Sequence, residues 1–344
     1  MGLISLLRKQ NKKALFTTPS HSGKFAIYHK LYQWYKNDIS EVDAYNPQDA
    51  LKDAEAKAAI IYGVKKTKFL TNGSTSGIIA SVLACCDNHD KLLIWNNSHK
   101  CHRNAGLLAN TDIIEYELPF NKEWGIFEPL TTAEFEKLLY EHRPKAIIIT
   151  SPTYEGMVSD VEEFSKISKK YGCYLIIDEA HGALYPFSDN LPTSSVKYAD
   201  FTVQSLHKTA GGINPTALLH TNTELDIDSS LARITTTSPS YPMLATIEAN
   251  INYLNSKKGK YAIESLIKQI NEIKKRLTNL EFYGNDPTKI LMKKSEMSGY
   301  QLSEILFEKF NIEDEITNEK STMLLTGIGT SKSKLDKLYH LIKL

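Results

Sequence analysis

Cysteine is scarce in this sequence, with four among 344 residues. Two of them, Cys85 and Cys86, are adjacent and poorly placed to pair with each other, while the other two lie in or beside apolar runs. Disulfide-stabilised proteins of oxidising compartments usually carry more cysteine at regular spacings. The cysteine content therefore predicts a reducing compartment, which we take to be the cytoplasm.

Long apolar runs are also missing, and none approaches the ~20 residues that a helix needs to cross a bilayer. The opening stretch "MGLISLLRKQNKK" places apolar residues before a basic cluster, which is the reverse of a signal peptide. Leu6 stands where a myristoylation signal requires Ser or Thr. We expect no membrane association.

An excess of either charge is absent, because 41 basic residues face 40 acidic ones and neither sign forms a long block. A balanced surface creates no broad field that would attract nucleic acid or anionic lipid. The charge pattern therefore argues against both partners. A small polar or zwitterionic ligand fits better.

From about residue 53 to about 220, helix-period stretches alternate with short aliphatic or β-branched runs. This alternation predicts an α/β fold with a mostly parallel sheet and helices on both faces. In such sheets ligands bind at the carboxyl ends of the strands. The runs that resemble strands are 91–95, 112–116, 145–150, 173–178, 201–205 and 215–220, and candidate helices include 131–142 and 161–172.

We expect three parts along the chain. Residues 1–40, rich in aromatic and basic side chains, are predicted to form an N-terminal arm, and residues 41–245 a large domain. Residues 246–344 are predicted to form a small C-terminal α/β domain. That domain includes a long helix over 261–277, whose apolar residues share one face.

Polar residues occupy the ends of three predicted strands. "NGSTSG" at 72–77 lies between an apolar stretch and an apolar helix, so its N–H groups, hydroxyls and helix dipole suit an anion such as a phosphate. An ordinary helix N-cap explains this motif equally well. Asp178 ends a second apolar run, where a carboxylate needs a cation or a hydrogen-bond donor, or acts as a cap for the next element.

Lys208, within "QSLHKTAGG" at 204–212, ends the third strand, where desolvation favours the neutral amine that a Schiff base requires. Such a lysine is more often simply solvated. A phosphate cradle, a carboxylate and a lysine together suit pyridoxal phosphate (PLP): the cradle holds the phosphate, Asp178 keeps the pyridine nitrogen protonated, and Lys208 binds the aldehyde. Ser205 offers a further hydroxyl, and His99 could stack on the ring.

A metal site at His99, Cys101 and His102 is the alternative for this histidine-rich stretch. Zinc sites usually combine two ligand pairs at short spacing, and the sequence shows no second pair. We therefore expect no metal.

Seven motifs, in order along the chain, resemble the ornithine/lysine/arginine decarboxylase family of fold-type I PLP-dependent enzymes, in particular its shorter bacterial members. The resemblance covers roughly residues 15 to 250. The matching stretches are "TPSH" (18–21), "NGSTSG" (72–77), "NSHKCH" (97–102), "SPTYEG" (151–156), "DEAHG" (178–182), "QSLHKT" (204–209) and "TTSPSYPML" (236–244).

The resemblance implies an aspartate aminotransferase-like large domain and the decarboxylation of lysine, ornithine or arginine to an amine and CO2, within amino-acid and polyamine metabolism. It implies that Lys208 is the Schiff-base lysine and Asp178 the partner of the pyridine nitrogen. His99 would stack on one face of the ring and Ala180 on the other. The phosphate residues that it implies are Ser74, Thr75, Ser76, Ser205 and His207.

Family members form dimers with active sites between subunits, so the resemblance implies a homodimer in which residues 236–241 reach the neighbouring site. It implies Ser240 and Glu155 as substrate contacts, although a solvated loop carboxylate explains Glu155 equally well. His181 and His207 are implied as proton donors or as neighbours of the substrate carboxylate, without a choice between them.

The sequence departs from the family pattern at two points. Pro215 stands where family members often carry Gln seven positions after the lysine, so we expect the following strand to begin differently. The small domain is compressed, and we expect the family's additional C-terminal domain, which helps to shape the substrate entrance, to be lacking.

The sequence is compatible to different degrees with three other functions. An aminotransferase or another lyase of the same fold would use the same cofactor, but aminotransferases usually carry an arginine near the C-terminus, and here the last one is Arg276 in a basic helix. "DEAH" at 178–181 also occurs in helicase-type ATPases, but no GxxxxGK[ST] phosphate loop precedes it. A PLP-binding protein without turnover stays open.

Overall fold

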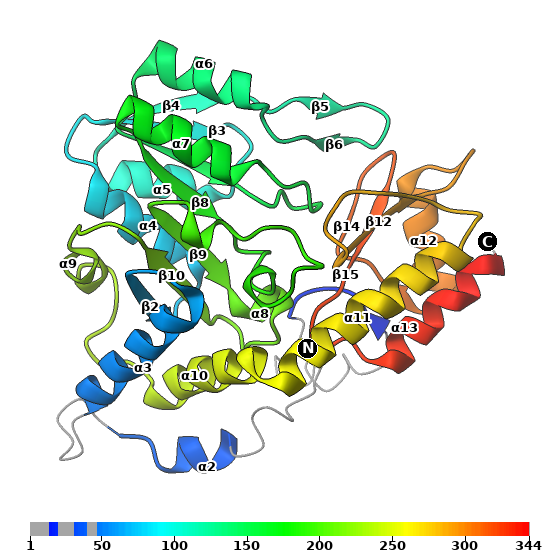
Figure 1. The fold of residues 1–344 in the computed structure, drawn as a ribbon. Coiled ribbons are helices and arrows are strands. Elements are labelled where there is room, and N and C mark those ends of the chain that lie inside the picture. Colours follow the sequence, from blue (N-terminus) through cyan, green and yellow to red (C-terminus); the bar gives the residue numbers. More distant parts are fainter. Residues whose placement is uncertain (1–13, 20–30, 40–46, 344) are drawn as a thin grey trace, which may run out of the picture.

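A seven-stranded sheet forms the centre of the larger part of the protein (Figure 1). The computed structural model describes residues 14–19, 31–39 and 47–343. Within this sheet only β10 runs antiparallel to its neighbours, so the predicted mostly parallel α/β sheet is confirmed. The order of the strands is β2 (Lys66–Leu70), β10 (Ala217–Thr221), β9 (Phe201–Ser205), β8 (Tyr174–Asp178), β7 (Ala146–Thr150), β3 (Lys91–Trp95) and β4 (Asp112–Tyr116).

Helices cover both faces of this sheet because its strands are apolar on both sides. Leu92 and Ile94 of β3 pack with one group of helices, and Leu93 and Trp95 pack with another. Alternate residues of a strand point to opposite faces, so a fully apolar run needs two covering layers. One layer contains α4 (Ser74–Cys85), α5 (Lys100–Leu108) and α9 (Ile227–Ala232), and the other contains α6 (Thr132–His142) and α7 (Val161–Tyr171).

Local signals define where the helices of the second layer begin and end. Thr131 and Glu134 form a reciprocal capping box at the start of α6. The side chain of Asp160 accepts the N–H of Glu163 at the start of α7, and Gly172 ends that helix with φ 65°. These caps satisfy backbone groups that have no partner within the helix.

A second, smaller sheet is antiparallel throughout and lies beside the first (Figure 1). Ile270, Leu302 and Leu335 come from three helices and share one core with the strand residues Ile290 and Leu324. The small α/β part that the sequence predicts is thus present. Its strands are β11 (Glu281–Tyr283), β12 (Lys289–Lys293), β15 (Thr322–Leu325) and β14 (Ile316–Thr317), with helices α11 (Lys257–Arg276), α12 (Gly299–Lys309) and α13 (Lys332–Leu338).

The remaining elements join and border these two parts. Most of the predicted arm lies outside the described residues, and the domain boundaries stay predictions; the one at 245/246 falls within α10. The N-terminal β1 (Ala14–Leu15) pairs with β13 (Ile312–Glu313) of the smaller part. The others are α2 (Leu31–Lys36), α3 (Pro47–Tyr62), β5 (Phe120–Asn121), β6 (Ile126–Phe127), α8 (Leu206–Thr209), α10 (Tyr241–Asn255) and the 3-10 helices Tyr185–Phe187, Ser195–Lys197 and Tyr339–Lys343.

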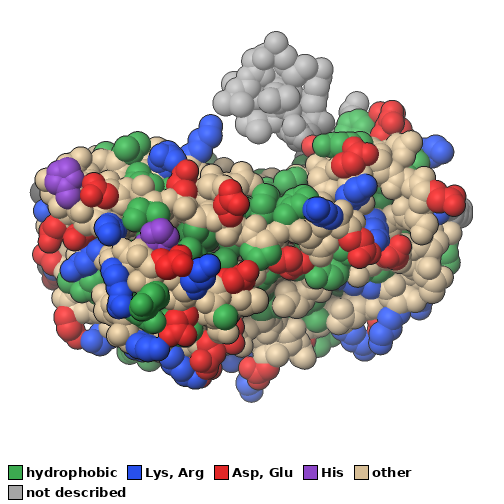
Figure 2. Space-filling model, turned by 90° about the horizontal axis from the view of Figure 1, so that it is seen from above, with side chains coloured by type: hydrophobic (Ala, Val, Ile, Leu, Met, Phe, Trp, Pro, Cys, Tyr) green, Lys and Arg blue, Asp and Glu red, His purple; other side chains and the backbone are tan. Residues whose placement is uncertain are grey.

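The surface agrees with the balanced charge of the sequence. Figure 2 shows acidic and basic side chains interspersed over one face, without a block of either sign. In the part of the chain that the structure describes, every helix is too short or too polar to cross a bilayer. All four cysteines are buried and free. The predicted cytoplasmic location stays a prediction.

His220 on β10 is buried at the centre of the larger part. Its Nδ1 lies 2.9 Å from Thr67 Oγ1, and its Nε2 lies 3.3 Å from Gln204 Oε1. Burial lowers the pKa of His220 to about 3, because the charged ring has no water around it. His220 is therefore neutral in the folded protein at pH values where an unfolded chain binds a proton.

Replacing His220 with Gln should reduce the acid sensitivity of the fold. Between the ordinary pKa of 6.5 and the folded value of about 3, the unfolded chain binds one more proton, so stability falls as the pH falls. One proton corresponds to about 1.4 kcal/mol per pH unit. In urea unfolding at pH 7 and pH 5, we expect wild type to lose about 2 kcal/mol more than His220→Gln. Between pH 7.5 and 8.5 the difference between the two proteins should stay constant, and equal acid losses would contradict the assignment.

Candidate functional site

A pocket of about 560 Å³ lies at the carboxyl ends of the parallel strands. Asn72 follows β2, Asn97 follows β3 and Tyr154 follows β7, while Asp178 ends β8 and Lys208 follows β9. Parallel strands bring these ends to one edge of the sheet, although they are far apart in the sequence. The opposite wall comes from the β5–β6 hairpin and from the smaller sheet, through Gly125, Phe127, Leu291, Ile316, Asn318 and Ser321.

Most of the predicted site residues line this pocket. Ser76 and Ser205 are buried behind its wall, and Ser240 lies elsewhere, where it accepts the N–H of Met243 as the cap of α10. A role for Ser240 in a neighbouring subunit stays a prediction, as do the other predicted roles. The predicted residues that line the pocket are Ser74, Thr75, His99, Glu155, Asp178, Ala180, His181, His207 and Lys208.

The turn before α4 opens directly onto the pocket. Gly73 has φ +83°, a conformation that favours glycine, and it allows Ser74 and Thr75 to begin the helix at the pocket wall. A Cβ on Gly77 would lie 2.8 Å from Val203, so glycine is needed for α4 to approach β9 closely. The first N–H groups of α4 and its dipole therefore face the site.

Ser76 and Ser205, both predicted to bind a phosphate, differ in whether their hydroxyls already have a hydrogen-bond partner. The Ser76 hydroxyl donates to the Gly73 carbonyl at 2.8 Å, so it stabilises the turn itself. The Ser205 hydroxyl is buried and has no hydrogen-bond partner among the described residues. A buried hydroxyl without a partner is costly, so the Ser205 hydroxyl is free to donate to a group from outside the chain.

Lys208 reaches the pocket from α8, the single turn that follows β9. Its Nζ lies 3.1 Å from His181 Nε2. Burial lowers the pKa of Lys208, while the negative charges of Asp178 and Glu315 oppose this effect. Lys208 therefore loses its proton and becomes a free amine at a lower pH than a solvated lysine does, as the sequence predicts.

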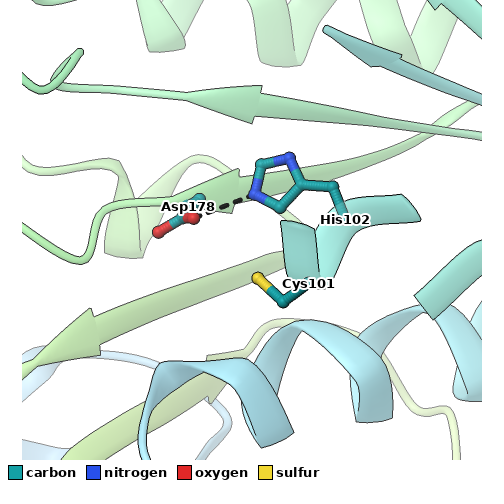
Figure 3. A group of neighbouring side chains, drawn as sticks. All are labelled: Cys101, His102 and Asp178. Carbon is teal, nitrogen blue, oxygen red and sulfur yellow. Dashed lines mark hydrogen bonds and ion pairs between the residues drawn. The ribbon is translucent and has the colours of Figure 1, made fainter. Parts of the chain in front are cut away.

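Asp178 forms a buried pair with His102, whose role the sequence analysis did not foresee (Figure 3). The Asp178 Oδ2 atom lies 2.9 Å from His102 Nε2, and Oδ1 accepts the N–H of Ala180 at 3.1 Å. Burial alone would raise the pKa of Asp178, but hydrogen bonding and electrostatic attraction from His102, together with the charge of Lys208, hold it below its ordinary value. The carboxylate therefore stays ionised at the floor of the pocket.

Cys101, next to His102 on the first turn of α5, completes a group of three potential metal ligands whose ligand atoms lie within 4.8 Å of one another (Figure 3). Burial raises the pKa of the Cys101 thiol to about 12, so the sulfur is protonated. Without a metal, the group is a hydrogen-bonded carboxylate–imidazole pair beside a neutral thiol. A bound metal would itself displace the thiol proton, so the expected absence of a metal stays a prediction.

His99 and His207 lie at the entrance to the pocket. His99 caps α5, with Nδ1 accepting the N–H of Cys101, and its side chain is exposed. His207 Nδ1 donates to the Thr216 carbonyl at 3.1 Å. Pro215 also lines the pocket and precedes β10, so the residue that departs from the family pattern lies in the site.

Lys289 is a second residue that the sequence analysis missed. It begins β12, is only 1% exposed, and its Nζ lies 2.6 Å from His181 Nδ1. The sequence carried one signal for it, because Lys289 opens the apolar run "KILM", much as Lys208 closes an apolar run. Its contact with His181, which is 108 positions away in the chain, has no local signal.

Replacing His102 with Leu should raise the pKa of Asp178, because the hydrogen bond and charge that now oppose the effect of burial would be lost. Side-chain 13C NMR on aspartate-labelled protein would follow the titration, with the Asp178 signal identified by its loss in Asp178→Asn. We expect Asp178 to titrate at a higher pH in His102→Leu than in wild type. Cys101→Ser, which keeps a neutral group beside the pair, should leave the titration near wild type; an unchanged titration in His102→Leu would refute the role of His102.

Comparison with known proteins places this site in a family. Residues 10–290 match the family model described as "Orn/Lys/Arg decarboxylase, major domain". The arginine decarboxylase of Bacillus anthracis is 27% identical over 318 residues, which cover 86% of this chain and 64% of that protein. The chain thus spans about two thirds of that relative's length.

Solved structures share the fold at low sequence identity. Lysine decarboxylase A from Pseudomonas aeruginosa has a TM-score of 0.76 at 18% identity, covering 85% of this chain and 50% of that one. Alanine–glyoxylate aminotransferase from Nostoc sp. has a TM-score of 0.70 at 14% identity, covering 100% and 99%. The fold is therefore that of fold-type I PLP-dependent enzymes, and the match over residues 10–290 shows that the chain belongs to the Orn/Lys/Arg decarboxylase family.

Proposed function

We propose that this protein binds PLP and decarboxylates a basic amino acid to its amine and CO2. The observation that carries the proposal is the presence of Lys208 and the ionised Asp178 in one pocket, beside the start of α4. Membership of the decarboxylase family supports the reaction. The name of the relative from Bacillus anthracis supports arginine as the first substrate to test.

The residues present fit PLP. The α4 N-terminus, Thr75 and the unpartnered Ser205 hydroxyl suit its phosphate, and Asp178 suits its pyridine nitrogen. Lys208 suits its aldehyde. When bound, PLP supplies an electron sink for the bond that breaks at the α-carbon.

The remaining steps depend on side chains of this chain. Lys208, as a free amine, is available to bond to a carbonyl carbon and to accept a proton at Nζ. Burial and the charges of Lys208 and Lys289 lower the pKa of His181 well below its ordinary value, so His181 is a neutral neighbour of Lys208. Leu291, Phe127 and Ile316 form an apolar part of the wall opposite the sheet.

Glu155 is our proposed contact for the cationic end of the substrate. It lines the pocket in the loop after β7, and burial raises its pKa, while the nearby Lys289 charge partly opposes this rise. A partly desolvated carboxylate gains from a cationic partner. An ammonium or guanidinium group would provide that partner.

The same fold occurs in aminotransferases, but one feature favours the decarboxylase. Among the described residues, those that line the pocket include no arginine to bind the α-carboxylate in the way that aminotransferases of this fold usually do.

We also propose a homodimer, as the family resemblance implies, with residues 236–241 contributing to the neighbouring subunit's site. Sedimentation of the purified protein would test the dimer.

Replacing Lys208 with Ala should abolish decarboxylation. After mixing with PLP, wild type should show a visible absorbance band that changes with one of arginine, lysine or ornithine, and release CO2 from the same amino acid. Lys208→Ala should lack the band and release CO2 at least about 100-fold more slowly, since a nucleophile and proton carrier is lost. Lys170→Ala, at an exposed lysine on α7, is the matched control. A wild-type band without CO2 release from any of the three would leave a PLP-binding protein without this activity.

Replacing Glu155 with Gln should weaken binding of the basic substrate. Loss of a half-buried carboxylate should lower kcat/KM by about 10- to 100-fold, mainly through KM. Steady-state CO2 release measures both constants, with Glu162→Gln on the exposed face of α7 as the control. Equal kinetics for Glu155→Gln and wild type would remove Glu155 from the substrate site.

A further inference from the structure

Three nitrogen-bearing side chains form a continuous buried chain of contacts. Lys208 Nζ lies 3.1 Å from His181 Nε2, and Lys289 Nζ lies 2.6 Å from His181 Nδ1. The imidazole of His181 thus bridges two lysines from different parts of the fold, one after β9 and one on β12. The ring edge of Tyr154 packs against His181, with 4.8 Å between ring centroids.

Lys289 forms no ion pair with a carboxylate among the described residues, where carboxylates act on it only through space. Besides His181, its Nζ contacts the Tyr154 carbonyl at 3.1 Å and lies 5.6 Å from the centroid of the Tyr154 ring. Gly156 leaves room for its aliphatic stem, because a Cβ there would lie 2.7 Å from Lys289 Cγ. A fully buried lysine without an ion pair is costly to the fold. Its position against His181, a residue that lines the pocket, suggests a role in the site.

Donor and acceptor chemistry restricts the charge of this group. A neutral imidazole carries one N–H, so one ring nitrogen donates and the other accepts. If both lysines were ammonium ions, both ring nitrogens would have to accept, which a neutral ring cannot do. At most one of the two lysines is therefore an ammonium ion in this arrangement.

We propose that Lys289 is the proton partner of Lys208 and exchanges one proton with it through the ring of His181. Lys289 as an ammonium ion gives a proton to Nδ1 of His181, while the ring gives its Nε2 proton to the free amine of Lys208. Lys289 becomes a free amine, Lys208 becomes an ammonium ion, and His181 changes tautomer without changing charge. The reverse transfer restores the first state.

The role of this exchange rests on the proposed function of Lys208. A lysine that acts in turn as a nucleophile and as a proton carrier has to lose and regain a proton within the pocket. Burial lowers the pKa of Lys289 to about 8, with the charge of Asp286 opposing this shift, so its ammonium ion gives up a proton near neutral pH. Lys289 is thus a positioning residue that acts through His181.

Other ionisable groups face the three members and contribute to their titration. They act through space, and the four carboxylates among them favour the ammonium forms of the lysines. The groups that face Lys208, His181 or Lys289 are Asp178, Cys101, Glu315, Asp286, Glu155, His99 and His207.

The test measures how readily Lys208 reacts as a free amine in the full chain after removal of small molecules with hydroxylamine and dialysis. Formaldehyde with cyanoborohydride methylates free amines, and peptide mass spectrometry reports the rate at Lys208 from pH 6 to 10. In Lys289→Met, His181 can accept from a Lys208 ammonium ion, so Lys208 should hold its proton to higher pH. The methylation rate at pH 7.5 should fall about tenfold for each pH unit of this shift.

Two comparisons separate the relay from simpler effects. Lys274→Met removes another partly buried lysine of the smaller part, which donates to the Lys289 carbonyl, and should leave the rate at Lys208 unchanged. In a His181→Phe background, Lys289→Met should have no further effect, because the bridging ring nitrogens are gone. A similar effect with and without His181 would show charge repulsion through space and overturn the relay, as would an unchanged rate in Lys289→Met.

Imidazole 15N NMR of wild type tests the same idea without relying on the folding of a variant. The His181 ring, assigned by comparison with His181→Phe, should be neutral at pH 7 and should give ring 15N shifts between those of the two pure tautomers, because the exchange populates both. A doubly protonated ring at pH 7 would overturn the proposal. Neither measurement requires turnover, so the relay and the decarboxylase activity can fail independently.

Discussion

The shared direction of six strands is the constraint on which the site depends. β2, β3, β4, β7, β8 and β9 all end at one edge of the sheet, and only β10 runs the other way. Residues from 72 to 208 therefore meet in one pocket, although no two of the contributing segments are adjacent in the sequence. Close approach of α4 to β9 then brings a helix N-terminus to the same edge.

Burial gives this edge its chemistry. Asp178 remains ionised because His102 and Lys208 outweigh the cost of desolvation, whereas desolvation prevails at His181 and Lys289. One low-dielectric environment thus holds a permanent anion next to amines that exchange protons near neutral pH. Whether a buried group stays charged or loses its charge depends on its hydrogen-bonding and charged partners more than on its residue type.

The sequence predicted the strands well where an apolar run ended at a clear turn. The runs 91–95, 112–116 and 201–205 match β3, β4 and β9. Asp178 and Lys208 were predicted as site residues because each lies at the end of such a run, and both line the pocket. The reversed direction of β10 has no signature in its own residues. The His102–Asp178 and Lys289–His181 contacts join positions 76 and 108 residues apart, so only the folded chain reveals them.

The position of Lys289 on β12 has a mechanical consequence. Leu291, two residues further along the same strand, forms part of the pocket wall, so both side chains move with the smaller sheet. Any rotation of that sheet away from the larger part would open the wall and stretch the Lys289–His181 contact in a single movement. Solvent entry and loss of proton exchange would then coincide, which would make the protein chemically idle whenever its pocket is open.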